Sequence, residues 1–351
     1  MKVALVMFPI SAEGGLSTRG MDTLRLIRDA GHDCNFYRIR YSDQMHMAGT
    51  RSPAIEVRKS GNRLQHRNLS ITAKHLPGTV AHLSGYDLVV FLHPCPHLSD
   101  KAKAAANWTA LYNEVRARKV VTFSDVYIDK YYPHFAQVTN YTPLGINSAV
   151  ARHVSGFLKI PVETALRPVH LHASAGKWES RRGIVWPNAW RDWKGFAAFV
   201  RAMKDDGRDV TLYGSGRAGE KCARELVSFR NSGGRVIGQV APAKVQAHLA
   251  NARLAIDLTG ASKKYEGHYN GSMIEAMLLG CPVGVRSNMW INSWIPKDAV
   301  MSLDTSSTSD LYESIRNASM SSRSERVARD AQTWARGHTN PARVLAQYGI
   351  E

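Results

Sequence analysis

The stretch Tyr265–Val283, YEGHYNGSMIEAMLLGCPV, decides the fold of this chain. It joins a polar, glycine-rich loop to a short apolar helix and then to the start of a buried strand. Asn270, Gly271 and Ser272 are typical of a helix start, where unpaired N–H groups and the positive end of the helix dipole point at an anion such as a diphosphate. Gly280 is expected to end the helix in the left-handed conformation, and the proline two residues later prevents the helix from continuing.

One carboxylate stands near the first turn of this predicted helix. Glu275 is placed to accept two hydrogen bonds from a ribose diol, and the loop before it completes the pattern of a nucleotide-sugar pocket. The run resembles the donor-binding element of GT-B glycosyltransferases, in which a Glu-Ala-Met-x-x-Gly-x-Pro-Val segment follows a loop. The alternative is an ordinary amphipathic helix with Glu275 solvated.

The resemblance departs from the family pattern at one position. The retaining branch of this fold carries a second glutamate eight positions before the first, and here Gly267 stands there. Glu266 stands one residue before that position and is a further donor-binding candidate. The resemblance implies that Glu275 holds the ribose and that Gly271 and Ser272 lie at the diphosphate.

Length and composition favour a two-domain globular protein. The chain has 351 residues, 44% hydrophobic and 21% charged, and no apolar run of membrane-spanning length. The N-terminal segment suits a first buried strand better than a signal peptide. We therefore expect a cytoplasmic monomer without a membrane span, located in the host cytoplasm if a phage encodes it.

The charge balance indicates a polyanionic partner. The chain holds 46 Lys and Arg against 29 Asp and Glu, a net charge of +17. Between Arg38 and Lys74 eight basic residues face two acidic ones. This density favours nucleic acid or an anionic membrane surface, although a basic solvated surface would show the same excess. The DNA-binding candidates in this region are Arg58, Lys59, Arg63 and Arg67.

Apolar segments alternate with helical ones along both halves of the chain, which predicts an α/β fold with two parallel sheets. The predicted strands are 3–8, 34–39, 88–92, 120–123, 184–186, 210–213, 236–237 and 254–257. The predicted helices are 23–30, 101–116, 195–203, 219–229, 243–250 and the segment that contains Glu275. We place a Rossmann-like acceptor-side domain at residues 1–165 and a nucleotide-sugar-binding domain at 177–322. By analogy with GT-B proteins, residues 323–351 return to the first domain.

Several second-half segments follow strands and should meet at one sheet edge, because ligands of open parallel sheets bind outside the carboxyl ends of the strands. Arg191 and Lys194 follow the first strand of this half and would stabilise a departing diphosphate, or they are surface charges at a helix start. The small residues after the next strand allow a close backbone approach. The remaining donor-binding candidates are Gly214, Ser215, Gly216 and, at the nucleobase, Val240.

In the first half, Asp125 is the candidate base, since a carboxylate just after a buried strand is held rigidly. Its segment resembles the Phe-Thr-Asp element of phage DNA β-glucosyltransferases, which implies that Asp125 removes the acceptor proton. Capping of a turn is the alternative. His93 is the rival catalytic residue, because retaining relatives place a histidine near there. Gly15 would approach the donor.

Aromatic residues follow Asp125 and suggest a stacking surface for an extruded base, although such residues also serve as packing. Tyr131 and Tyr132 are the candidates. The sequence therefore predicts a GT-B glycosyltransferase that transfers a sugar, expected to be glucose, from a UDP-sugar to a 5-hydroxymethylpyrimidine in double-stranded DNA. The alternatives are a retaining enzyme acting on a glycan or lipid and a non-catalytic DNA-binding protein. No cofactor beyond the UDP-sugar donor is strictly required; a divalent metal is compatible with this chemistry, but no sequence pattern indicates one.

Overall fold

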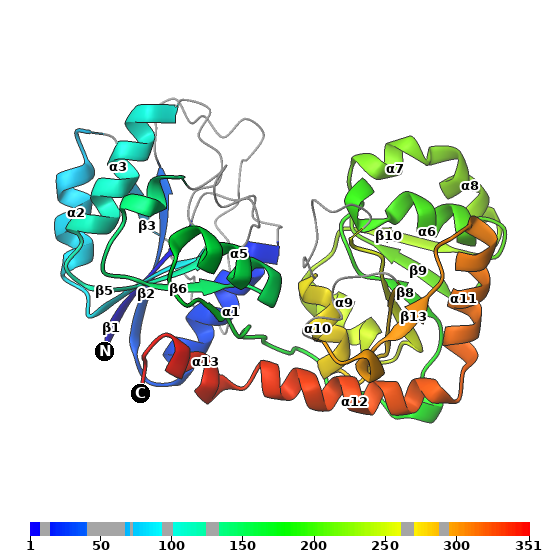
Figure 1. Ribbon diagram of the computed structural model, residues 1–351. Coiled ribbons are helices and arrows are strands. Elements are labelled where there is room, and N and C mark those ends of the chain that lie inside the picture. The colour runs from blue at the N-terminus through cyan, green and yellow to red at the C-terminus, as the bar shows by residue number, and fades with distance from the viewer. Residues whose placement is uncertain are drawn as a thin grey trace. The chain divides into compact units, whose positions relative to one another are not determined.

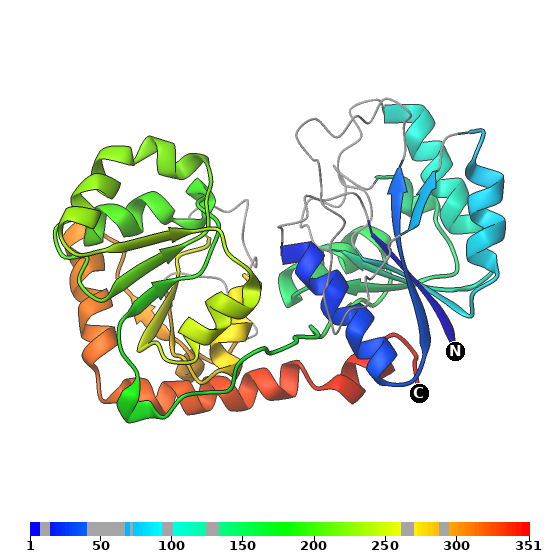
Figure 2. The same cartoon turned by 180° about the vertical axis from the view of Figure 1, so that it is seen from behind.

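The computed structural model describes residues 1–7, 15–40, 67–70, 73–92, 101–123, 133–260, 270–287 and 295–351. These residues form two compact units, one of residues 1–169 with 339–351 and one of residues 170–338. Each unit is a parallel sheet with helices on both faces (Figures 1 and 2). This is the doubly wound arrangement that the alternating pattern predicts.

The first unit contains a parallel sheet of seven described strands in the order β3-β2-β1-β4-β5-β6-β7. The central strands are buried along nearly their whole length, because helices cover both faces. The strands are Lys2–Met7 (β1), Asp33–Arg40 (β2), Arg67–Ser70 (β3), Leu88–Leu92 (β4), Arg118–Phe123 (β5), Thr142–Gly145 (β6) and Glu163–Thr164 (β7).

Two groups of helices cover this sheet. The core on one face contains the aromatic residues Trp108, Tyr112 and Phe135, and the ring centroids of Tyr112 and Phe135 are 4.8 Å apart. The helices of that face are α2 (Leu76–Ser84), α3 (Lys101–Glu114), the 3-10 helix η1 (Pro133–Gln137) and α5 (Ser148–Leu158). On the other face lie α1 (Gly15–Asp29) and the C-terminal helix α13 (Pro341–Gln347).

The C-terminal segment returns to the first unit later than predicted. Helix α12 (Arg323–His338) groups with the second unit, and the return begins at Thr339 rather than at residue 323. The reason is the apolar face of α12, which is buried against the second unit, and the side chain of Gln332, which donates to the Leu278 carbonyl at 2.8 Å.

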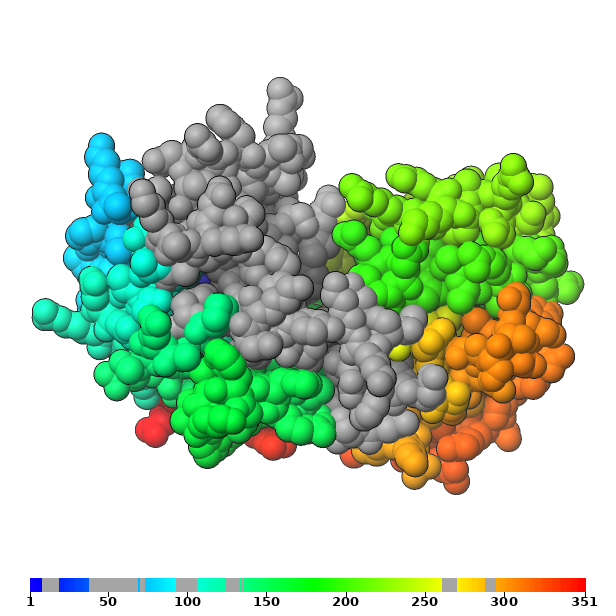
Figure 3. All heavy atoms as spheres, turned by 45° about the horizontal axis from the view of Figure 1, so that its top comes forward, coloured from blue at the N-terminus to red at the C-terminus, as the bar shows by residue number. Residues whose placement is uncertain are grey.

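The second unit contains a parallel sheet of six described strands in the order β10-β9-β8-β11-β12-β13. The strands are Ile184–Trp186 (β8), Val210–Tyr213 (β9), Arg235–Gly238 (β10), Leu254–Asp257 (β11), Val283–Arg286 (β12) and Met301–Leu303 (β13). One face carries α6 (Phe196–Met203), α7 (Arg217–Lys221), α8 (Ala223–Asn231) and α11 (Thr308–Met320). The other carries α9 (Pro242–Leu249), α10 (Gly271–Leu278) and α12. The outer surfaces of α7, α8 and α11 are visible in Figure 3, in green and orange.

The predicted single helix over 219–229 is two helices in the structure. Cys222 separates α7 from α8 with a backbone (φ −119°, ψ 33°) that is not helical. Its buried thiol donates to the Ala218 carbonyl at 2.9 Å, which closes the end of α7.

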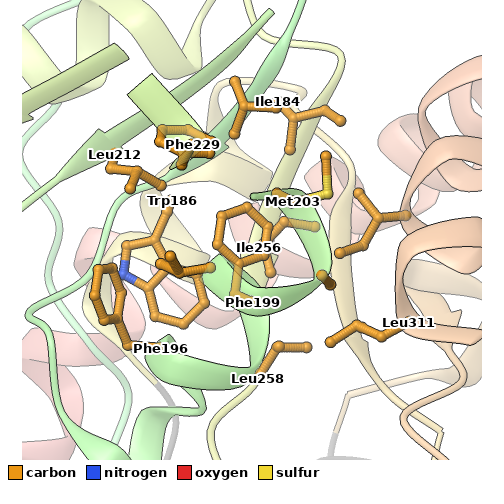
Figure 4. Close-up of a cluster of buried hydrophobic side chains, with 14 of the residues drawn as sticks. Ile184, Trp186, Phe196, Phe199, Met203, Leu212, Phe229, Ile256, Leu258 and Leu311 are labelled. Atoms are coloured by element: carbon orange, nitrogen blue, oxygen red, sulfur yellow. The ribbon is translucent and has the colours of Figure 1, made fainter. Parts of the chain in front are cut away.

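Aromatic and aliphatic side chains from β8, β11 and α6 hold the centre of the second sheet (Figure 4). The ring of Trp186 lies 5.1 Å from Phe199 and 5.5 Å from Phe196, and all three are fully buried. Ile256 and Leu258 pack into the same cluster. This packing fixes the carboxyl ends of β8 and β11, from which the candidate site is built.

Residues 270–286 form the predicted helix and strand, α10 and β12. Helix α10 ends before Gly280, which has the left-handed φ of +66°. The amides of Gly280 and Cys281 donate to the carbonyls of Met277 and Ala276 at 2.9 and 2.8 Å. This Schellman-type ending confirms the predicted role of Gly280. Of the helices in the described ranges, none is long and apolar enough to cross a membrane.

Candidate functional site

The predicted donor-binding residues of the second unit follow its strands at one sheet edge. All six strands are parallel, and their order changes direction between β8 and β11. Ligands of open parallel sheets bind outside the carboxyl ends of the strands at such a point. Here the loops after β8 and β11 meet the N-terminus of α10.

A buried polar cluster stands at the end of β11. The carboxylate of Asp257, 1% exposed, accepts the N–H of Thr259 at 3.0 Å, and the Nδ2 atom of Asn270 lies 2.9 Å from both carboxylate oxygens. The same Nδ2 atom lies 2.6 Å from the Thr259 hydroxyl. The cluster anchors the start of α10 to the sheet.

This cluster engages the side chain of Asn270, which the sequence places at the helix start. Asn270 occupies the N-cap position, but its side chain accepts no N–H of α10 because it donates to the Asp257 cluster. The amide of Met273 donates to the Asn270 carbonyl at 3.0 Å. The amides of Gly271 and Ser272 precede it and lie in the first turn, where helix N–H groups have no intrahelical partner. They are placed to meet an anion.

Asn188 connects β8 and β11 to the same helix. Its backbone carbonyl accepts the indole N–H of Trp186 at 2.9 Å, and its Nδ2 atom donates to the Ile256 carbonyl at 3.3 Å. Its Oδ1 atom accepts the hydroxyl of Ser272 at 2.6 Å. Because Asn188 is only 3% exposed, this bonding fixes the first turn of α10 relative to two strands.

Lys194 lies in the loop after β8, and its pKa is shifted from the usual value for lysine. It ends the 3-10 helix η3 (Asp192–Lys194) and is half-buried, with its Nζ atom 5.1 Å from the Trp193 ring. Burial lowers the pKa of Lys194 to about 8, with the Arg191 charge acting in the same direction and the Asp257 charge opposing both. Arg191 itself is exposed at the start of η3.

The glycines after β9 are required by packing between loops. Gly214 (φ +93°) and Gly216 (φ +148°) have left-handed or related backbones that disfavour other residues. A Cβ atom on Gly214 would lie 2.5 Å from the Asn188 carbonyl oxygen, and one on Gly216 would lie 2.3 Å from that of Trp190. Ser215 completes this contact, since its carbonyl accepts the Trp190 amide at 2.9 Å. Close approach therefore occurs between two loops of the site, and direct donor contact by these three residues stays a prediction.

Glu275 lies one turn into α10 and is 7% exposed. Among the residues that the structure describes, Gln246 is its hydrogen-bond donor, with Nε2 at 3.3 Å from the Glu275 Oε2 atom. A carboxylate offers about four acceptor positions, so a single long bond leaves most of this capacity unused. The site thus holds a largely buried carboxylate able to accept further hydroxyl donors.

The segment after β10 is hydrogen-bonded to the loop after β9. Val240 is half-buried between β10 and α9, and the neighbouring Gln239 accepts the Ser215 hydroxyl at 3.3 Å. The hydroxyl of Tyr213 lies 3.1 Å from Nδ1 of His248, and burial raises the pKa of Tyr213 and lowers that of His248. A nucleobase contact of Val240 remains a prediction.

Many predicted residues of the first half fall outside the described ranges. Gly15 begins α1, and Arg67 begins β3, where it pairs with Tyr37 of β2. The residues that lie outside are Asp125, His93, Tyr131, Tyr132, Arg58, Lys59 and Arg63 in the first half and Glu266 in the second. In the ranges that are described, no group of three or more His, Cys, Asp or Glu side chains forms a metal site.

Three residues of this edge were not predicted from the sequence. Asp257 could have been found, because it is a charged residue that ends an apolar strand. Asn188 follows a strand and a proline, which is a weaker signal. Gln246 stands in a helix with no sequence feature that connects it to Glu275.

Protein-family models and curated proteins include no match to this chain. Solved structures match over nearly its whole length. HepE of Anabaena in complex with UDP-glucose is 12% identical with a TM-score of 0.71, covering 99% of this chain and 98% of that one. An alpha-glucosyltransferase in complex with UDP and a 13-mer DNA containing an HMU base is 11% identical with a TM-score of 0.66, over 99% and 98%.

A third structure is a mutant of S. aureus TarM in complex with Fondaparinux, alpha-GlcNAc-glycerol and UDP. It is 10% identical with a TM-score of 0.70, covering 99% of both chains. The fold of this chain is therefore the fold of these three proteins, the two-domain GT-B fold that the sequence predicts.

Proposed function

We propose that this protein is a UDP-sugar-dependent glycosyltransferase that transfers glucose to a 5-hydroxymethylpyrimidine in double-stranded DNA. The assignment of a UDP-sugar donor is supported by the residues at the carboxyl ends of the strands in the second unit. The acceptor half is supported by the charge of the chain and by the likeness to an alpha-glucosyltransferase bound to DNA.

The observation that carries the donor assignment is the carboxylate of Glu275. It is 7% exposed and has one described donor at 3.3 Å. Burying a charged group with unused acceptor positions is costly, and the two hydroxyls of a ribose would occupy them with charge-assisted bonds. Glu275 therefore acts as the ribose acceptor of UDP.

The diphosphate lies at the first turn of α10 in this proposal. The amides of Gly271 and Ser272 and the positive end of the helix dipole face it. Lys194 and Arg191 add positive charge from the loop after β8. This charge stabilises the phosphate oxygen that becomes negative as UDP departs.

In the transfer itself, the hydroxymethyl oxygen of the base attacks the anomeric carbon of the sugar. A new carbon–oxygen bond forms, and the bond from the anomeric carbon to the β-phosphate oxygen breaks, with its electron pair leaving on UDP. In an inverting transfer, Asp125 takes the hydroxyl proton as general base and the configuration at the anomeric carbon is inverted. In the retaining alternative, His93 and Glu266 serve at the donor sugar in place of an Asp125-driven inversion.

The DNA acceptor is favoured by the net charge of +17, which suits a polyanion. A base within a duplex is inaccessible to a sugar donor, so the enzyme extrudes it, and Tyr131 and Tyr132 stack on it. Arg58, Lys59, Arg63 and Arg67 contact phosphates. The glycan alternative rests on the likeness to TarM, whose complex holds Fondaparinux and alpha-GlcNAc-glycerol.

Labelled UDP-sugars incubated with hydroxymethylated duplex DNA, unmodified duplex DNA and saccharide acceptors test the proposal. We expect label from UDP-glucose in hydroxymethylated DNA alone. Label in a saccharide, with none in DNA, would replace the acceptor and keep the donor. DNA binding without transfer or donor hydrolysis would leave a DNA-binding protein.

A further inference from the structure

We propose that Gln246 is a positioning residue that orients Glu275 for the ribose and couples donor binding to residues 170–172, where the chain enters the second unit. The inference rests on the proposed role of Glu275 as the ribose acceptor. It follows from three hydrogen bonds made by one buried amide.

The Gln246 side chain is 2% exposed and uses both ends of its amide. Its Oε1 atom accepts the backbone N–H of His172 at 2.7 Å. Its Nε2 atom donates to the backbone carbonyl of His170 at 3.1 Å and to Oε2 of Glu275 at 3.3 Å. The amide thus pairs with two backbone groups as a neighbouring strand would, and its second N–H reaches the carboxylate.

The orientation of this amide is fixed by its partners. A backbone N–H can only donate, so the atom facing His172 must be the oxygen. The atom facing the His170 carbonyl and the Glu275 carboxylate must then be the nitrogen, since an oxygen there would face two acceptors. Rotating the amide by half a turn would set its NH2 group against the His172 N–H and its oxygen against the His170 carbonyl and the Glu275 carboxylate, so all three bonds would break.

The amide therefore sets the direction of the Glu275 carboxylate. With Oε2 held by Gln246, the rotation of the carboxylate is restricted and Oε1 is left for the sugar hydroxyls. A preorganised acceptor binds more tightly than one that must be ordered on binding. Because the same amide holds His170 and His172, an occupied Glu275 also steadies the entering segment.

The first unit contains a matched amide that has no connection to Glu275. Gln347 accepts the amide of Leu166 at 2.7 Å and donates to the carbonyl of Thr164 at 2.9 Å and to Glu163 Oε2 at 3.4 Å. It makes the same pattern of bonds on the same stretch of chain, a few residues earlier. Gln347→Met is therefore the control for the loss of such hydrogen bonds without a change at Glu275.

The experiment compares the affinities for UDP and 2′-deoxy-UDP by calorimetry, because their ratio reports recognition of the ribose. In the unmodified protein the ratio should be about 10 to 100, the size of one charge-assisted hydrogen bond. Gln246→Met should lower it about fivefold or more by freeing the carboxylate. Gln347→Met should lower the melting temperature and leave the ratio unchanged.

Gln246→Glu adds a pH readout that a merely structural role would not show. At pH 8 two neighbouring carboxylates repel and the ratio should fall as in Gln246→Met. At pH 5.5 one carboxyl shares a proton with the other and again donates, so the ratio should partly recover. Hydrogen exchange of the His172 amide should slow when UDP is added to the unmodified protein and should not respond in Gln246→Met.

The failures of the two proposals are distinguishable. If Glu275→Ala leaves the ratio unchanged, the donor assignment of the proposed function is wrong. If Glu275→Ala brings the ratio to about 1 while Gln246→Met keeps it, Gln246 is only structural. If the variants of Gln246 do not fold, hydrogen exchange on the unmodified protein still decides, since a His172 amide insensitive to UDP overturns the coupling.

Discussion

The Ser272 hydroxyl donates to the Oδ1 atom of Asn188 at 2.6 Å, and this bond joins the first turn of α10 to the loop after β8. Asn188 in turn reaches the Ile256 carbonyl on β11. The start of the helix, where a diphosphate is expected, is therefore placed by Asn188 in the loop after β8 and by Asp257 at the end of β11 rather than by a side-chain cap. If the diphosphate binds at this helix start as proposed, its site depends on Asn188 even without contact between this residue and the ligand.

Asn188→Ala is expected to destabilise the protein and weaken UDP binding together. It leaves the Ser272 hydroxyl without this acceptor and the buried Ile256 carbonyl without this donor, so the free energy of unfolding should fall by about 1–3 kcal/mol. Urea unfolding and calorimetry measure the two effects. Ser228→Ala, at an exposed helix position, is the control and should change the free energy of unfolding by less than about 0.5 kcal/mol.

Glu275→Ala should weaken UDP binding by about 2–4 kcal/mol, because two charge-assisted hydrogen bonds to the ribose are lost. Circular dichroism should show an intact fold, since alanine is a strong helix former in the middle of α10. Calorimetric titration with UDP measures the loss. An unchanged affinity would remove Glu275 from the donor site.

Lys194 predicts how UDP affinity depends on pH. The pKa of Lys194 in the free protein is about 8, lowered mainly by burial, so the side chain is charged below that pH and neutral above it. A bound diphosphate favours the charged form and raises the pKa of Lys194 in the complex. The affinity should therefore be flat below pH 8 and fall by up to about tenfold per pH unit between pH 8 and the pKa of the complex.

Titrations with UDP between pH 7 and 10 measure this dependence. Lys194→Met should bind UDP more weakly at pH 7 and lose the decline above pH 8. If the decline persisted in Lys194→Met, another group would be responsible, and the assignment of Lys194 to the phosphate would be wrong.

The sequence predicted the central strands of both sheets and the ending of α10 because these depend on local signals, whereas the short strands β3, β6, β7 and β13 were not predicted. Runs of apolar residues mark β1, β4 and β11, and Gly280 with the following proline ends the helix wherever it packs. The bonding within the site depends on contacts between distant residues. Gln246 and Glu275 are 29 residues apart, and the sequence patterns of α9 and α10 do not indicate that the Gln246 amide contacts the Glu275 carboxylate.

Asn270 stands at the helix start that the sequence indicates, but the sequence does not reveal the hydrogen-bond partner of its side chain. Its place before α10 indicates a cap, and it does occupy that position. A buried Asp257, however, needs donors more strongly than a helix start that water or a ligand can reach. The position of α12 was missed for a similar reason, since its packing on α10 and on the 3-10 helix Lys297–Ala299 decides which unit it joins.

Asp125→Asn should reduce turnover by about 10²–10⁴-fold, the usual contribution of a positioned general base. Affinities for UDP and for hydroxymethylated DNA should change little, because the substitution keeps size and polarity. Single-turnover transfer and separate binding titrations measure these effects. His93→Ala is the matched test of the retaining alternative. If Asp125→Asn kept full turnover and His93→Ala lost it, the inverting mechanism would be wrong.

The basic excess between Arg38 and Lys74 predicts the salt dependence of DNA binding. If about six phosphates are neutralised, the slope of log affinity against log salt concentration should approach about −5 for a duplex. Reversing Arg58, Lys59 and Arg63 together to glutamate should flatten this slope by about 3, because three phosphate contacts are lost. The affinity for UDP should stay the same, since these residues are distant in sequence from the site on the second unit. DNA binding that is absent at low salt, or indifferent to salt and to the three reversals, would contradict a DNA acceptor and move a saccharide acceptor to first place.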